Sequence, residues 1–315
     1  MWAVSRIEAD WWRVMVMPLL LGSFLLMGLV LIPGIGSEIN GARRWFSFFG
    51  LTLQPVELMK PVVVVYMAYY MAAFPDRLKQ FSSGLAPMMV VLGISVLLLL
   101  LQPDFGSSAL LVALCVSMWF VGGVPLRHLM LMLVTVVPGG IVIMLAEPYR
   151  VKRFLSFMDP WADPLGSGYQ LVQSMLAFGT GGLYGAGLGQ GVQKLFYLPE
   201  PFTDFISAVI AEELGMPGML ALISIFALLL MRGMQLARRV SDSFQRLVVA
   251  GCVTLLATTF FINLAAAMGV MPTKGMPMPL MSYGGSALFG TCILLGLIFS
   301  VQRHLPGNVH RESKA

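Results

Sequence analysis

The chain has 315 residues, of which 58% are hydrophobic and only 11% charged, with a formal net charge of +5 at pH 7. Soluble domains are about a quarter charged, so this composition excludes a soluble globular protein and indicates a polytopic membrane protein. The three cysteines, Cys115, Cys252 and Cys292, all fall in apolar runs. We interpret them as buried structural thiols rather than a disulfide framework.

Eight apolar runs approach the length of about 20 helical residues that a bilayer core of about 30 Å requires. They cover 12–33, 57–74, 85–102, 106–123, 128–146, 205–231, 247–270 and 283–301. The runs predict an all-α fold: a single integral membrane domain over 1–315 with about eight transmembrane helices. One large loop at 147–204 and a polar tail at 302–315 complete it. No cleavable signal peptide is expected, because the first run is already span-length.

The basic residues are distributed unevenly between the two sides of this arrangement. Eight spans place both termini on one side, and that side holds twelve of the twenty Lys and Arg residues. The positive-inside rule therefore places both termini in the cytoplasm and loops 34–56 and 147–204 outside. The twelve are Arg6, Arg13, Arg77, Lys79, Arg127, Arg232, Arg238, Arg239, Arg246, Arg303, Arg311 and Lys314. The seven on the opposite side are Arg43, Arg44, Arg150, Lys152, Arg153, Lys194 and Lys274.

The external loop 147–204 is the most polar part of the chain. Its four basic residues run against the charge bias, which suggests that they bind an anionic group; they are Arg150, Lys152, Arg153 and Lys194. Apolar residues recur at helical spacing over 170–178, which predicts a short amphipathic helix. The glycines between 179 and 191 argue against a continuous helix through the middle of the loop.

Carboxylates mark the end of this loop and the span that follows. Asp204 lies where the sixth span begins, which suits either a helix cap or a catalytic group. Glu212 and Glu213 lie roughly 12 Å deeper. Helical rotation makes Glu212 the better candidate to face the same side as Asp204. The alternative for both glutamates is hydrogen bonding among neighbouring helices.

Two further groups of polar residues lie beside or within the spans. Glu57 and Lys60 lie one turn apart in the second span, where they form either a self-satisfying pair or a functional site. Arg43, Arg44 and Trp45 follow the first span, as interfacial anchors commonly do.

The segment 271–285 is rich in proline and glycine, which excludes a regular helix. Its Lys274 either reaches an anion or marks the water boundary. Motifs for phosphate-binding loops, metalloprotease helices, Cys/His metal clusters and serine nucleophile elbows are absent from the sequence. All three histidines fall on the cytoplasmic side or in the tail. External chemistry must therefore use carboxylates and cations.

Several longer motifs together resemble one family. They are NGARRW at 40–45, QPVELMK at 54–60, QPDFG at 102–106, AEPYRVKR at 146–153, DPLGSGYQLVQS at 163–174, LPEPFTDFISAVIAEELG at 198–215 and PTKGMPMPLMSYGGSA at 272–287. These motifs resemble the SEDS family (shape, elongation, division, sporulation) over about the whole chain. The form VQKLFYLPE at 192–200 is closer to the division branch than to the elongation branch.

The resemblance implies a peptidoglycan glycosyltransferase that polymerises lipid II into β-1,4 glycan outside the cytoplasmic membrane, at the division septum. It implies Asp204 as the catalytic residue, which we interpret as the general base of an inverting transfer. Lys60 matches the family's lysine and is predicted to reach Asp204. The remaining candidates for substrate binding are Arg43, Arg44, Trp45, Arg150, Lys152, Arg153, Lys274 and Glu212.

The resemblance also implies partners and leaves alternatives open. The expected partners are lipid II, undecaprenyl-pyrophosphate-linked glycan, a class B penicillin-binding transpeptidase, other division proteins and membrane lipid, with no nucleic acid. No cofactor is specified; a divalent cation, Mg²⁺ or Mn²⁺, is left open, and no ligand set is legible. A lipid II flippase and a non-catalytic division scaffold are the alternative functions.

The sequence departs from the family pattern in two places. The family usually has ten spans, and the first run here resembles the third of them, so we expect two N-terminal spans to be missing. Phe202 stands where the family usually has histidine before Thr-Asp.

Overall fold

The computed structural model describes residues 1–39, 41–48, 51–145, 148–272 and 275–305. The chain forms two compact units. Unit 1 comprises Met1–Met130, Leu230–Thr258 and Gly285–Ala315, and unit 2 comprises Leu131–Leu229 and Thr259–Gly284. Three long helices therefore pass from one unit into the other.

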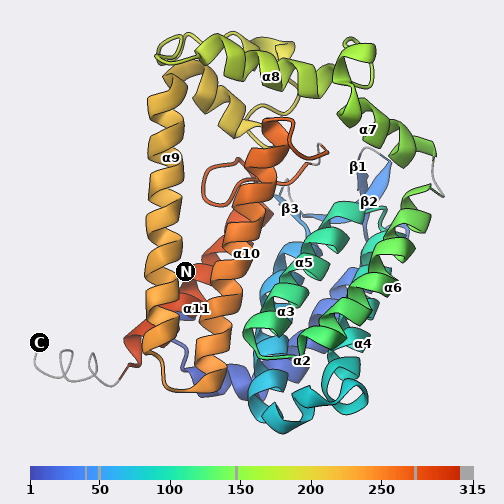
Figure 1. Ribbon diagram of the computed structural model, residues 1–315, viewed down its shortest axis with the longest axis vertical. Helices are drawn as coiled ribbons and strands as arrows, with labels where there is room; N and C mark the ends of the chain where they lie inside the picture. Colours follow the sequence, from blue (N-terminus) through green and yellow to red (C-terminus); the bar gives the residue numbers. More distant parts are fainter. Residues whose placement is uncertain (40, 49–50, 146–147, 273–274, 306–315) are drawn as a thin grey trace, which may run out of the picture. The chain divides into compact units, whose positions relative to one another are not determined.

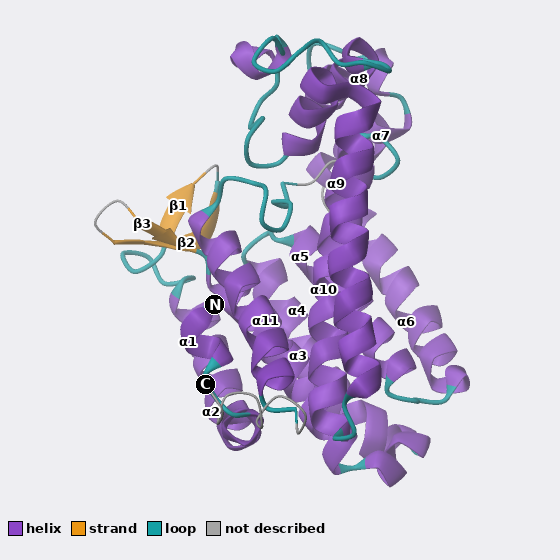
Figure 2. Ribbon diagram, turned by 90° about the vertical axis from the view of Figure 1, so that its left-hand side faces the viewer, coloured by secondary structure: helices purple, strands orange, loops and turns teal. Residues whose placement is uncertain are grey.

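Unit 1 is a helical bundle around α3 (Figures 1 and 2). Its helices are α1 (Trp2–Ser5), α2 (Ala9–Leu29), α3 (Pro55–Ala73), α4 (Ala86–Leu101), α5 (Phe105–Val121), the start of α6 (Leu126–Leu145), the end of α9 (Ile206–Arg239), most of α10 (Ser243–Ala267) and α11 (Gly285–Arg303). A 3₁₀ turn at Pro75–Lys79 and a π turn at Phe81–Leu85 join α3 to α4. Gly251 on α10 lies so close to Val64 and Met118 that a Cβ there would be 2.7 Å from each side chain. This glycine therefore allows α10 to pack against α3 and α5.

Unit 2 holds the rest of α6, α9 and α10 together with the elements of the large loop. These are α7 (Pro148–Met158), a 3₁₀ turn (Pro160–Ala162), α8 (Tyr169–Gly181) and a π turn (Gln193–Tyr197). The predicted helix at 170–178 is confirmed by α8, which lies against the first turns of α9 (Figure 1). The helix α7 was not predicted. This short helix is amphipathic, with basic and apolar residues on different faces, and a search for span-length apolar runs does not detect it.

The predicted all-α membrane fold is confirmed. Six helical segments are long and apolar enough to cross a membrane: Ala9–Leu29, Pro55–Ala73, Phe81–Leu101, Ile206–Arg239, Ser243–Ala267 and Gly285–Arg303. Two shorter apolar helices, Phe105–Val121 and Leu126–Val142, fall on the remaining predicted runs. Each of the eight predicted runs thus coincides with a helix.

Residues 34–56 were predicted as a loop, whereas unit 1 forms a three-stranded antiparallel sheet there (Figure 2). Its strands are β1 (Ser37–Ile39), β2 (Ala42–Phe48) and β3 (Leu51–Leu53), paired in the order β1-β2-β3. Gly41 has φ +73°, which glycine adopts without steric cost and which tight hairpins require. The Asn-Gly pair at 40–41 was therefore an overlooked hairpin signal.

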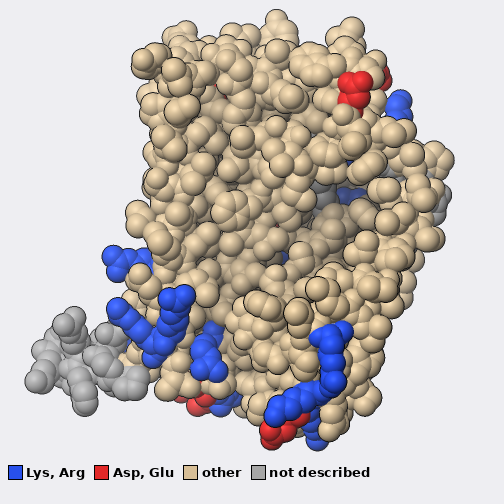
Figure 3. Space-filling model, in the orientation of Figure 1, with Lys and Arg blue, Asp and Glu red and all other residues tan. Residues whose placement is uncertain are grey.

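Basic side chains gather at the end of unit 1 where α3 and α9 end and α10 begins (Figure 3). Arg13 on α2 pairs with Asp242 between α9 and α10 at 2.5 Å. Burial raises the pKa of Asp242, but hydrogen bonds from Arg13 and from the Gln245 N–H outweigh it and hold that pKa below its usual range. The side of the membrane that this end faces stays a prediction.

Candidate functional site

Asp204 ends a tight turn two residues before α9 begins. Glu200 has φ +53°, and its carbonyl oxygen accepts the backbone N–H of Asp204 at 3.1 Å. The hydroxyl of Thr203 donates to the Glu200 carboxylate at 2.9 Å. Asp204 is half-buried. The carboxylate thus lies where the sequence placed it, at the start of the sixth predicted span.

Apolar residues hold both ends of this turn. Leu198 and Phe205 are 2% and 5% exposed and belong to one cluster with Ala177, Ala208 and Ala267. The cluster joins α8, the start of α9 and the end of α10. The polar turn is therefore fixed between two buried side chains, and Asp204 directly precedes the second of them.

The irregular segment 275–283 lies directly against the turn. The backbone N–H of Tyr283 donates to the Phe202 carbonyl at 2.8 Å. The side-chain amide of Asn263 donates to the carbonyl oxygens of Asp204 and Met276. A Cβ at Gly275 would lie 2.6 Å from Oδ2 of Asp204, so a side chain at this position would displace the carboxylate. Neither Asn263 nor Gly275 was predicted; the available signal for Asn263 was an amide inside an apolar run.

A break in α9 explains the glycine-rich stretch before the turn. Gly215 has φ +59° within the helix, so the helical hydrogen bonds stop there. Pro217 has no N–H for the carbonyl of Glu213, and that carbonyl accepts the N–H of Gly187 at 3.0 Å instead. A Cβ at Gly185 would lie 2.3 Å from the same carbonyl oxygen. The glycines therefore allow one backbone to pack directly on another.

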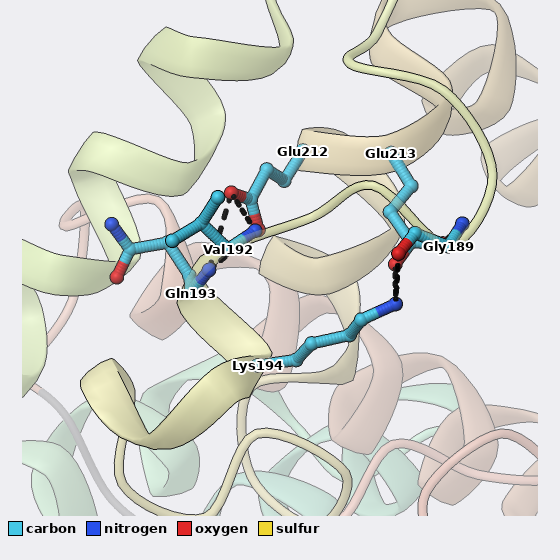
Figure 4. Close-up of polar contacts among 6 residues, drawn as sticks. All are labelled: Gly189, Val192, Gln193, Lys194, Glu212 and Glu213. Carbon is cyan, nitrogen blue, oxygen red and sulfur yellow. Dashed lines mark hydrogen bonds and ion pairs between the residues drawn. The ribbon is translucent and has the colours of Figure 1, made fainter.

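Figure 4 shows how the two glutamates of α9 hold the loop that leads to the Asp204 turn. The Glu212 carboxylate, in a residue 1% exposed, accepts the backbone N–H groups of Val192 at 2.8 Å and Gln193 at 3.2 Å. The Glu213 carboxylate binds the Lys194 ammonium at 2.5 Å and the Gly189 N–H at 3.0 Å. Both glutamates were predicted to hydrogen-bond to neighbouring helices or, for Glu212, to face the side of Asp204; they bind a loop.

These contacts also change the interpretation of the basic residues of the large loop. The anion that Lys194 binds is Glu213 of the same chain. On α7, Lys152 is exposed and Arg153 is half-buried. The side chain of Arg150 and all of Lys274 lie outside the described residues.

The predicted group Arg43, Arg44 and Trp45 lies on β2 rather than in a loop. Arg43 pairs with Glu38 on β1 at 2.9 Å. Arg44 donates to the carbonyl oxygens of Gln102 and Pro103, at 2.6 and 2.5 Å. These contacts tie the sheet to the connection between α4 and α5. Both guanidinium groups therefore have structural partners within unit 1.

Lys60 and Glu57 form the self-satisfying pair that was one of the two alternatives left open by their spacing. The Lys60 ammonium donates to the Glu57 carboxylate at 2.7 Å, and both residues are buried in unit 1. Gly290 on α11 packs against Glu57, where a Cβ would lie 2.8 Å from the Glu57 carbonyl oxygen. Asp204 belongs to unit 2, and the predicted contact between Lys60 and Asp204 stays a prediction.

The residues that the structure describes contain no group of three or more His, Cys, Asp or Glu side chains suited to hold a metal ion. The divalent cation stays an open alternative.

Together, the apolar helices and the Asp204 turn define a multi-pass membrane protein with a carboxylate at the start of a broken helix. Residues 1–306 match the model of the family described as cell cycle protein, which groups FtsW, RodA and SpoVE. The chain belongs to this family, which confirms the SEDS resemblance.

The relatives are named as probable peptidoglycan glycosyltransferases FtsW. The protein of Saccharophagus degradans is 48% identical over 290 residues, covering 91% of this chain and 75% of the relative. The protein of Geobacter sp. (strain M18) is 40% identical over 307 residues, covering 98% of this chain and 84% of the relative. The chain is therefore similar to the division branch that the sequence favoured.

Solved structures also share the fold. A chain from a solved peptidoglycan synthase complex is 33% identical, with a TM-score of 0.80 over 96% of this chain and 84% of that chain. The rod shape determining protein RodA of Thermus thermophilus is 30% identical, with a TM-score of 0.69 over 96% and 82% of the respective chains.

Proposed function

We propose that this chain is a peptidoglycan glycosyltransferase that joins lipid II units into glycan strands at the outer face of the cytoplasmic membrane. The observation that carries the proposal is the family match over residues 1–306, which includes the turn that fixes Asp204. Relatives at 40–48% identity carry the same enzyme name. The fold is shared with a chain of a peptidoglycan synthase complex.

In the proposed reaction, Asp204 is the general base. Its carboxylate takes the proton of the 4-hydroxyl of the acceptor GlcNAc, and the resulting oxygen forms a bond with C1 of the donor sugar. The bond between C1 and the phosphate oxygen breaks, and undecaprenyl pyrophosphate leaves with the electron pair. A single displacement converts the α-linked diphosphate into a β-1,4 bond.

The leaving pyrophosphate requires positive charge. Arg153 on α7 is the candidate that the described residues leave without an assigned structural partner. Lys152 on the same helix also interacts electrostatically with Asp163, and Arg150 and Lys274 stay the candidates from the sequence. Arg43 and Arg44 hold the sheet through Glu38 and the Gln102 carbonyl. They could bind the pyrophosphate only if these contacts broke. A bound divalent cation, Mg²⁺ or Mn²⁺, would supply the same charge.

The proposal extends to partners and location. A class B penicillin-binding transpeptidase would cross-link the strands, since polymerisation and crosslinking are coordinated in the similar peptidoglycan synthase complex. The excess of basic residues at one end of unit 1 supports cytoplasmic termini. The division branch of the relatives supports a septal location and contact with other division proteins.

The test is strand synthesis from labelled lipid II by the purified protein in liposomes with its transpeptidase partner. Asp204→Asn keeps the size and the capping ability of the side chain but removes the proton acceptor. We expect normal folding and a loss of synthesis of about 10²–10⁴-fold. Asp159→Asn, which alters an exposed aspartate between α7 and the following turn, is the matched control and should keep full synthesis.

The same liposomes separate the alternatives. Retained synthesis by Asp204→Asn with an unchanged melting temperature would refute the catalytic assignment and favour a helix cap. Movement of lipid II across the bilayer without strand synthesis by the unmodified chain would indicate a flippase. Absence of both activities would indicate a scaffold.

A further inference from the structure

Asn263 is a buried amide near the end of α10, with 2% of the residue exposed. Its Nδ2 lies 2.9 Å from the carbonyl oxygen of Asp204 and 2.7 Å from that of Met276. A single nitrogen therefore joins the Asp204 turn to the segment 275–283.

The chemistry of this contact requires a neutral amide. The side-chain nitrogen of asparagine carries two hydrogens, which is the number needed to serve two carbonyl oxygens at once. The opposite orientation would place Oδ1 against both carbonyls, so the hydrogen-bond partners fix the direction of the amide. Serine and threonine offer one hydrogen, and a lysine would bring a charge into a buried site.

The contact acts on the backbone from which the Asp204 carboxylate projects. Asn263 fixes the carbonyl of Asp204, and Tyr283 fixes that of Phe202. The carboxylate itself lies beside Gly275, where a Cβ would come within 2.6 Å of Oδ2. A small shift of this backbone would therefore change both the direction of the carboxylate and its separation from the segment 275–283.

We propose that Asn263 is a positioning residue that holds the Asp204 carboxylate in its reactive direction. This inference rests on the proposed role of Asp204 as general base. Asn263 reaches the reaction through the backbone of Asp204, not through substrate. Its loss should therefore lower kcat and leave KM nearly unchanged, because substrate binding is not altered.

The test uses the full chain with its transpeptidase partner and labelled lipid II. Asn263→Leu keeps about the same volume and removes both hydrogen bonds. Asn263→Gln keeps the two donors one methylene further out and provides a second measurement if the leucine variant does not fold. Ser174→Ala is the matched control: Ser174 on α8 is fully buried and donates to the Ala267 carbonyl on α10 at 2.6 Å, so its hydroxyl binds the same helix as Asn263 but not the backbone of Asp204.

We expect Asn263→Leu to lower kcat by about 10- to 100-fold at a temperature where the protein stays folded, because small misplacements of reacting groups are costly. KM should stay within about twofold. Asn263→Gln should give a smaller loss of kcat, and Ser174→Ala should keep kcat even where its melting temperature falls.

A double mutant with Asp204→Asn distinguishes positioning from general damage. If Asn263 acts through the carboxylate, Asn263→Leu should cause no further loss in the Asp204→Asn background. An equal loss in both backgrounds, an unchanged kcat for Asn263→Leu, or an equal loss for Ser174→Ala would overturn the positioning role. Full synthesis by Asp204→Asn alone would instead refute the proposed function, whatever Asn263 does.

Discussion

Replacement of Glu212 should release the loop that precedes the Asp204 turn. The Glu212 carboxylate is 1% exposed and accepts the backbone N–H groups of Val192 and Gln193. In Glu212→Leu both N–H groups, whose contacts are partly buried, lose their acceptor, and a donor left unsatisfied away from water costs about 1–3 kcal/mol. Leucine also avoids the desolvation of a buried charge. We therefore expect the free energy of opening the loop to fall by roughly 2–4 kcal/mol.

Trypsin reports this opening at Lys194, because its ammonium is bound to Glu213 while the loop is closed. When opening is fast relative to cleavage, the rate follows the population of the open form. A loss of 2–4 kcal/mol raises that population by roughly 30- to 700-fold. In detergent-solubilised protein, where trypsin reaches both sides, cleavage after Lys79 on an exposed 3₁₀ turn of unit 1 provides the internal reference.

Two further variants test whether the lost acceptor causes the faster cleavage after Lys194. Glu212→Gln keeps one acceptor oxygen, so its cleavage rate should fall between those of the native chain and Glu212→Leu. Glu38→Gln removes an exposed carboxylate from its pair with Arg43 and should leave cleavage after Lys194 unchanged, since surface pairs contribute little. If Glu212→Leu is cleaved after Lys194 at the same rate as the native chain, the Glu212 carboxylate does not hold the loop.

Two other predictions concern the buried pair of α3 and the sidedness of the large loop. Lys60→Met leaves Glu57 buried without its partner and should cost about 3–5 kcal/mol, whereas Glu57→Leu with Lys60→Met should recover most of that loss in a melting experiment. An equally unstable double variant would show that the loss has another source. Leu165→Cys introduces a thiol at a residue 87% exposed between α7 and α8. It should react with an impermeant reagent in intact spheroplasts; reaction only after lysis would contradict the external loop.

Features were predictable from the sequence where one residue type has one dominant physical consequence. Long apolar runs fold as helices in a membrane because every backbone polar group must be satisfied internally, and each predicted run coincides with a helix. The pairing of Lys60 with Glu57 was one of the two alternatives that helical spacing allowed, and the structure contains it. The position of Asp204 just before α9 follows from the place where the apolar run begins.

The sequence was insufficient where a contact joins distant segments. Glu212 was placed correctly on α9, but its partners lie about 20 residues earlier, in a loop whose path depends on the break at Gly215. The break itself has a local signal, since Pro217 denies a hydrogen bond to Glu213. No local pattern shows that the carbonyl oxygens of Glu212 and Glu213 accept the N–H groups of Ala186 and Gly187 in another segment.

This difference explains why the residues around Asp204 divide into those that the sequence revealed and those that it did not. A carboxylate at a span boundary is chemically conspicuous, because a charge at membrane depth requires a reason. Gly275 has no side chain, and Asn263 acts by donating to main-chain carbonyl groups of two other segments, 59 residues before it and 13 residues after it. Gly275 matters because it leaves space for the Asp204 carboxylate, and Asn263 matters because it holds the backbone of Asp204. Both become visible only when the turn before α9 and the segment 275–283 are seen in contact.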